Sequence, residues 1–118
     1  MRRDEQGTLL RIFFGESDRL NHRPLYEVIV EEARARGLAG ATVLRGVEGF
    51  GAASVIHTAR LLRLSEDLPM IVEIVDADER IESFIPVIDD LIDHARCGAF
   101  ITTEHIRVIR HTPGSPPA

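Results

Sequence analysis

A glycine-rich segment that begins at an arginine is the part of this sequence whose residues could bind a ligand. Gly46, Gly49 and Gly51 fall within six residues directly after Arg45. Consecutive backbone N–H groups in turn conformations can form a nest that binds an anion. The alternative is that the glycines form a flexible hinge for the segment that follows them, and of the two interpretations we favour the hinge.

Further side chains that could bind an anion follow in a stretch, residues 52–67, that has no clean helical or strand period. The planar guanidinium of arginine donates paired hydrogen bonds to phosphate or carboxylate groups. If the stretch folds back, its cations would surround the glycines, although solvated charges or ion pairs between subunits explain them equally well. The candidate ligand-binding residues are Arg45, Gly46, Gly49, Gly51, His57, Arg60 and Arg63.

An acidic cluster, Asp76, Asp78 and Glu79, could hold a hard cation through its carboxylate oxygens. However, the same residues open a segment of helical period, where helix capping and the helix dipole already account for them. His57 and His105 have no partner at the spacing of a zinc site. A metal site is therefore the weaker interpretation, and no cofactor is expected.

An enzymatic role would need a nucleophile beside a base, or two carboxylates in different environments. Ser54 or Ser65 could pair with His57, but the sequence contains neither a nucleophile elbow nor a phosphate-binding P-loop. We therefore expect a binding or sensing protein rather than an enzyme.

Composition sets limits on the class of protein. The 118 residues fit one domain, residues 1–118, and the net charge of −5 argues against a nucleic-acid partner. Every basic side chain apart from histidine is arginine. Cys97 is the one cysteine, which suits a reducing cytoplasm, and the apolar stretch near the N-terminus is too short for a signal peptide.

The elements that would position these residues alternate between strand and helix. Strands are predicted at Thr8–Phe14, Ala41–Arg45 and Leu68–Val75 from their β-branched and apolar runs. A helix is predicted from Pro24, at its first position, to Gly37 at its end. A capping pattern from Asp76 to Glu79 predicts a second helix.

The last part of the chain is less regular. Pro86 falls inside the second helical pattern and predicts a kink there. Two short strands are predicted at Gly98–Thr102 and Ile106–Ile109, separated by a turn at Thr103–His105. A tail at 112–118, with its three prolines, is predicted to be disordered, which leaves an ordered core over about 8–111.

The predicted order is βαββαβ with a long loop after the second strand. With right-handed crossovers, both helices cover one face of a four-stranded sheet. The sequence therefore predicts an α+β, ferredoxin-like sandwich. Glu73 lies in an otherwise apolar strand, where a carboxylate needs a partner, and we expect it at a subunit interface.

Three segments of the chain are distinctive: LYEVIVEEARARGLAGATVLRGVEGFG, IHTARLLRLSEDLP and VEIVDADERIESFIPVIDDL. Within them, the RG-x-x-GFG pattern from Arg45 and SEDLP from Ser65 are the most specific parts. These segments resemble the PII-like family known as domain of unknown function 190, and the similarity extends from Leu9 to about Arg110.

The resemblance implies a homotrimer whose subunits pack their sheets together, with a loop at 46–64 that signals ligand occupancy to a partner. In PII proteins, adenine nucleotides bind between subunits and the loop contacts a membrane transporter or an enzyme. This sequence has Asp76-Ala-Asp-Glu79 after its third strand rather than a glycine-rich basic phosphate loop, so nucleotide binding does not carry over residue by residue.

The leading hypothesis is a PII-like trimeric regulator that binds a small anionic metabolite, such as an adenine nucleotide, between subunits. A membrane transporter or channel is the partner class that the resemblance implies. The alternative is a divalent-metal-binding protein like the CutA-like metal-tolerance proteins, based on five histidines and the acidic cluster. A third hypothesis is an enzyme acting on a small phosphorylated substrate.

Overall fold

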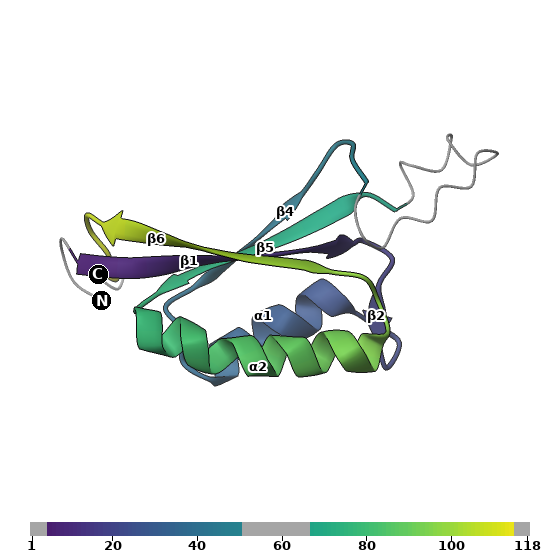
Figure 1. Ribbon diagram of the computed structural model, residues 1–118, viewed down its shortest axis with the longest axis horizontal. Coiled ribbons are helices and arrows are strands. Elements are labelled where there is room, and N and C mark those ends of the chain that lie inside the picture. Colours follow the sequence, from purple (N-terminus) through teal and green to yellow (C-terminus); the bar gives the residue numbers. More distant parts are fainter. Residues whose placement is uncertain (1–4, 51–66, 115–118) are drawn as a thin grey trace.

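The computed structural model describes residues 5–50 and 67–114, which form a four-stranded sheet with two helices packed on one face (Figure 1). The helices are α1, Leu25–Ala35, and α2, Asp78–Ala95. The strands of the sheet are β1 Glu5–Gly15, β4 Ala41–Arg45, β5 Pro69–Asp76 and β6 Phe100–Val108. The predicted ferredoxin-like α+β fold is confirmed.

Strand β1 lies in the interior of the sheet, whose order is β4-β5-β1-β6. It pairs antiparallel with β5 on one side and with β6 on the other; Leu10, for example, lies between Ile74 and Thr103. Strand β4 pairs with the outer side of β5. The sheet is therefore held together by pairings between segments that are far apart in the sequence.

The core lies between the sheet and the two helices and is built mainly from aliphatic side chains. Alternate residues of β1 and β5 point into it, which follows from the two-residue period of a strand. Burial of each large aliphatic side chain contributes about 1.5–3 kcal/mol. The largest fully buried side chains are Leu10, Ile12, Leu25, Ile29, Val72, Ile74, Ile81 and Ile88.

The first helix ends as predicted, while the second begins slightly later. Gly37 follows α1 with a φ of +74°, a conformation that glycine adopts without steric cost. Helix α2 begins at Asp78 with Ala77 at the N-cap, and no side chain caps it. The predicted cap, Asp76, instead ends β5 with its carboxylate buried. Pro86 lies inside α2, which is continuous around it.

The C-terminal strand differs from the prediction. Strand β6 runs without interruption through Thr103–His105, where a turn was expected, and pairs with β1 from Glu5↔Val108 to Phe13↔Phe100. The predicted turn is wrong because nine consecutive pairings with β1 hold this polar stretch in the extended conformation. The same pairing extends β1 to Glu5, earlier than predicted.

A small ribbon between β1 and α1 was not predicted. Its two-residue strands are β2, Arg19–Leu20, and β3, Arg23–Pro24. Asn21 and His22, which connect them, both have positive φ, as in the two-residue turns that join tight hairpins. Asparagine and histidine are enriched in this conformation, so this dipeptide was the available signal.

The second face of the sheet, which we call the open face, is not covered by either helix (Figure 1). It carries apolar side chains that the helix side does not bury, such as Leu44, which is 43% exposed, and Phe100, which is 61% exposed. The Phe100 ring packs edge-on against Phe13 with a centroid distance of 6.0 Å.

In the described ranges 5–50 and 67–114, neither helix is long and apolar enough to cross a membrane.

Candidate functional site

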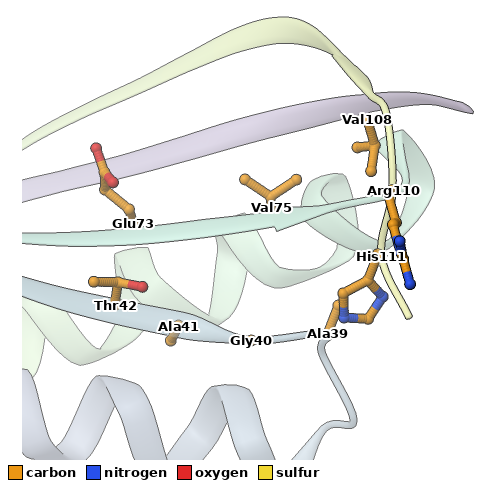
Figure 2. Close-up of a pocket in the computed structure, with 9 residues that line it drawn as sticks. All are labelled: Ala39, Gly40, Ala41, Thr42, Glu73, Val75, Val108, Arg110 and His111. Atoms are coloured by element: carbon orange, nitrogen blue, oxygen red, sulfur yellow. The ribbon is translucent and has the colours of Figure 1, made fainter. Parts of the chain in front are cut away.

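A cavity of about 420 Å³ lies at the end of the open face where β4 begins and β5 ends (Figure 2). This volume is within the usual range for small-molecule sites. One wall is the Ala39–Ala41 segment that leads into β4. The other lining residues are Thr42, Glu73, Val75, Val108, Arg110 and His111.

The cavity has hydrogen-bond acceptors at one end. Thr42 of β4 and Glu73 of β5 are directly paired across the two strands, so both side chains lie on the same face. Figure 2 shows them together, away from the other polar groups that line the cavity. The Glu73 carboxylate accepts hydrogen bonds and carries a negative charge, so this end favours a ligand group that carries hydrogen-bond donors.

The opposite end of the cavity is cationic. Arg110 and His111 lie on the segment that follows β6, near Ala39, as Figure 2 shows. The Arg110 Nε donates a hydrogen bond to the Thr112 hydroxyl at 3.0 Å, which leaves its terminal nitrogens for another acceptor. Guanidinium and imidazole groups are suited to bind an anionic group such as phosphate.

An apolar side chain forms the middle of the cavity. Val75 lies between the two polar ends, whereas Val108 lies beside Arg110 and the Ala41 side chain packs against the core. An apolar surface of this kind suits the face of a flat ring, and sites for small molecules are usually apolar with a few placed polar groups. The cavity is therefore complementary to a ligand with donors at one end, a ring in the middle and an anionic group at the other.

Asp76 accepts hydrogen bonds that hold the Ala39–Ala41 wall beside the cationic end of the cavity. Its Oδ2 accepts from the Ala39 backbone N–H at 2.9 Å and from the Arg80 Nε at 3.1 Å. Arg80 also donates to the Gly37 carbonyl oxygen, which ties the start of α2 to the end of α1. The segment that enters β4 is therefore anchored to α2 through Asp76 and Arg80.

Outside the cavity, Glu73 has a charged partner. The Arg11 Nε donates to Glu73 Oε2 at 2.8 Å, and the Arg11 Nη1 lies 3.5 Å from Glu104 Oε1. The hydrogen bond from Arg11 to Glu73 is the main cause that raises the pKa of Arg11 above its usual value. The predicted need of Glu73 for a partner is thus met within the chain, and its predicted place at a subunit interface stays a prediction.

Three of the sequence-predicted ligand residues lie outside the cavity. Arg45 is at the other end of β4, where its Nη2 lies 2.8 Å from Glu16 Oε2. The Gly46 N–H donates to the Pro69 carbonyl oxygen at 2.7 Å. A Cβ at Gly46 would approach Pro69 Cγ to 2.7 Å, so glycine is needed there for close packing. Gly49 also lies against Pro69.

The other predicted residues, Gly51, His57, Arg60 and Arg63, lie outside the described residues, as do Ser54 and Ser65. The ligand site predicted around the glycine segment therefore stays a prediction. Arg110 and His111 were missed because they sit in an irregular segment next to the predicted tail. The available signal was the pair of polar residues, Thr42 and Glu73, inside apolar strands.

The acidic cluster considered for a metal is divided among other partners. Asp76 is held by the contacts above, and the Thr8 hydroxyl donates to Asp78 Oδ1. Across residues 5–50 and 67–114, no three His, Cys, Asp or Glu side chains converge on a point where a metal ion could bind.

A separate group of titratable side chains lies at the opposite end of the domain, around the turn after β1. Asp18 Oδ2 accepts from the Gly15 N–H at 2.8 Å, and Asp67 Oδ1 accepts from the Ser17 N–H at 3.0 Å. Burial raises the pKa of Asp18. Burial, together with the negative charge of Asp18, raises the pKa of the Cys97 thiol to about 11.

Comparison with known sequences identifies the family. The model of DUF190, described as "Uncharacterized ACR, COG1993", matches residues 7–108. A UPF0166 protein from Aquifex aeolicus is 38% identical over 101 residues, covering 86% of this chain and 91% of the relative. A UPF0166 protein from Methanocaldococcus jannaschii is 33% identical over 84 residues, covering 71% and 77%.

Solved structures with similar folds include PII-like proteins. CPII from Thiomonas intermedia K12, a nitrogen regulatory PII-like protein bound to ADP, AMP and bicarbonate, superposes with a TM-score of 0.65 at 12% identity, covering 93% of this chain and 94% of that one. A PII-like signaling protein from Thermus thermophilus gives 0.63 at 15% identity, covering 91% and 93%. At such identities the likeness establishes the fold alone. From these matches and the topology, the chain belongs to the DUF190 family and has a PII-like, ferredoxin-like fold.

Proposed function

We propose that this protein is a PII-like regulator that binds an adenine nucleotide in the cavity between β4, β5 and the segment after β6. The observation that carries the proposal is the polarity of the cavity, with Glu73 and Thr42 at one end and Arg110 and His111 at the other. An adenine nucleotide has a matching order of groups: an amino group, a flat ring and a phosphate. CPII, which shares the fold, is bound to ADP and AMP.

In this proposal each end of the cavity recognises a different part of the nucleotide. The phosphate binds Arg110 and His111, and the base lies against Val75 with its amino edge toward Glu73. The ligand controls a partner protein rather than undergoing a reaction. The loop at 46–64 would carry the signal to that partner, for which a membrane transporter or channel is the class to examine first.

Self-association of three subunits through the open face is part of the same proposal. Phe13 and Phe100 form an apolar edge-to-face pair there, and Leu44 adds further exposed apolar surface. Contact between copies would remove this surface from water. Sedimentation analysis of the wild-type and Phe100→Glu proteins tests it. The wild type is expected to be a trimer and the variant a monomer, whereas a monomeric wild type would contradict the proposal.

Titration calorimetry with AMP and ADP tests the ligand. Arg110→Gln is expected to weaken binding about tenfold, because a hydrogen bond to a charged group contributes about 1.5–3 kcal/mol. Arg45→Gln is the matched control, since it removes the same charge at the other end of β4. Weakening by Arg45→Gln with no effect of Arg110→Gln would instead favour the site around the glycine segment.

A further inference from the structure

The ligand cavity shares one residue with the ion pairs on the open face. Glu73 lines the cavity, yet one of its two carboxylate oxygens, Oε2, is engaged by the Arg11 Nε at 2.8 Å. Arg11 lies opposite Glu73 on the neighbouring strand β1 and does not line the cavity itself. The state of Glu73 in the cavity is therefore set by a residue outside it.

The environment of Glu73 makes this partner necessary. Its side chain is only 28% exposed and lies on a strand between Ile71 and Val75 on the same face. A charge-assisted hydrogen bond restricts such a carboxylate to one orientation, and here Arg11 supplies it. Glu104 lies beyond Arg11 on β6, and its carboxylate is a second partner of the Arg11 guanidinium.

The contact with Arg11 also distinguishes the two oxygens of the Glu73 carboxylate. Because Arg11 occupies Oε2, Glu73 has its other oxygen, Oε1, for a donor in the cavity. Within the described part of the chain, no other donor hydrogen-bonds to the Glu73 carboxylate. An ionised carboxylate accepts hydrogen bonds and donates none, whereas a protonated one does both.

We propose that Arg11 is a positioning residue that makes the cavity selective for a purine with an exocyclic amino group; this inference rests on the proposed function. It holds the Glu73 carboxylate in one orientation, so that Glu73 Oε1 accepts a hydrogen bond from the amino group. The phosphate-binding end, at Arg110 and His111, supplies affinity that does not depend on Arg11.

The experiment compares two nucleotides that differ in the amino group alone: AMP and purine riboside 5′-monophosphate. The wild-type protein is expected to bind AMP about tenfold more tightly, the size expected for one hydrogen bond to a charged acceptor. In the Arg11→Met protein this ratio is expected to fall toward one, mainly through weaker AMP binding. Arg11→Lys, which keeps the charge, is expected to keep a higher ratio than Arg11→Met.

Glu104→Gln is the matched control because it removes the other, more distant partner of Arg11 at 3.5 Å and leaves the pair with Glu73. Its ratio is expected to equal that of the wild type. Thermal denaturation of each variant shows whether the fold persists, and Arg11 is 40% exposed, so its replacement leaves no buried gap.

The outcomes separate this inference from the proposed function. Failure of the wild-type protein to bind AMP would overturn the proposed function itself. Tight AMP binding with the same nucleotide ratio in wild type and Arg11→Met would overturn the role of Arg11 alone. An equal loss of discrimination in Glu104→Gln, or a ratio in Arg11→Lys no higher than in Arg11→Met, would also overturn it.

Discussion

The two faces of the sheet come from the same four strands but are built on different principles. On the helix side, Leu10, Val72 and Ile74 are completely buried, and the buried polar side chains, Thr8 and Asp76, both have hydrogen-bond partners. On the open face, apolar side chains are partly exposed and surround the pairs that Arg11 makes with Glu73 and Glu104. The helix side therefore buries its side chains in the core, while the open face leaves apolar and charged side chains exposed.

Neighbouring residues of β5 provide the largest test of this contrast. Ile74→Ala is expected to destabilise the fold by about 2–5 kcal/mol, because it leaves a cavity in a closely packed core. Val75→Ala, on the open face, is expected to cost less than about 1 kcal/mol. Urea denaturation measures both, and similar losses for the two variants would show that the faces are energetically equivalent.

The buried carboxylate tests the polar part of the helix side. Asp76→Asn weakens the contacts to the Ala39 N–H and to Arg80, and it is expected to cost about 1–3 kcal/mol. Glu104→Gln on the open face serves as the comparison and is expected to change stability by less than about 0.5 kcal/mol. A reversed order in denaturant midpoints would contradict the assignment of Asp76 as the anchor of the β4 entry.

The central ion pair of the open face is expected to contribute little to stability. Arg11→Met should lower the free energy of unfolding of the single subunit by no more than about 1 kcal/mol, because there the Arg11 side chain is 40% exposed and water screens the pair. Denaturation at low and high salt measures it. A loss of several kcal/mol would show that Arg11 stabilises the fold in addition to positioning Glu73.

The Cys97 thiol gives the smallest test, in reactivity rather than stability. With its pKa raised from 9.0 to about 11, it is expected to react with iodoacetamide at pH 8 roughly a hundredfold more slowly than an ordinary thiol. Asp18→Asn removes a negative charge and should accelerate the reaction. A rate in Asp18→Asn equal to that of the wild type would mean that burial alone protects the thiol.

The raised pKa of Cys97 determines how the stability of the fold depends on pH. Because the pKa of Cys97 is higher in the folded chain than the ordinary value of 9.0, folding favours the protonated thiol. The contribution of Cys97 to stability is therefore complete below a pH of 9.0 and is lost as the pH rises toward about 11. If the assignment is right, the melting temperatures of the wild type and of Cys97→Ala should approach each other as the pH rises over this range.

The sequence predicted the fold well because its signals were local and strong. The apolar run that became β5 and the glycine at the end of α1 were both visible in the residues. The turn expected at Thr103–His105 failed because a polar stretch on an edge strand takes its conformation from the strand beside it. Such pairing is not encoded in the stretch itself.

The candidate site was harder to predict than the fold. The sequence suggested the glycine segment as a ligand site, yet in the structure Gly46 packs against Pro69. The cavity instead joins Thr42, Glu73 and Arg110, which are far apart in the sequence and belong to no motif. Only the sheet order brings them together, so no local pattern could have identified them.

The interior position of β1 also constrains how the chain is made. Arg11 meets Glu73 across 62 residues and Glu104 across 93, so β1 is synthesised well before either of its neighbours in the sheet. Closure of such long loops slows folding. A nascent chain released before β6 leaves one edge of β1 unpaired, and that edge would be a target for chaperones and proteases.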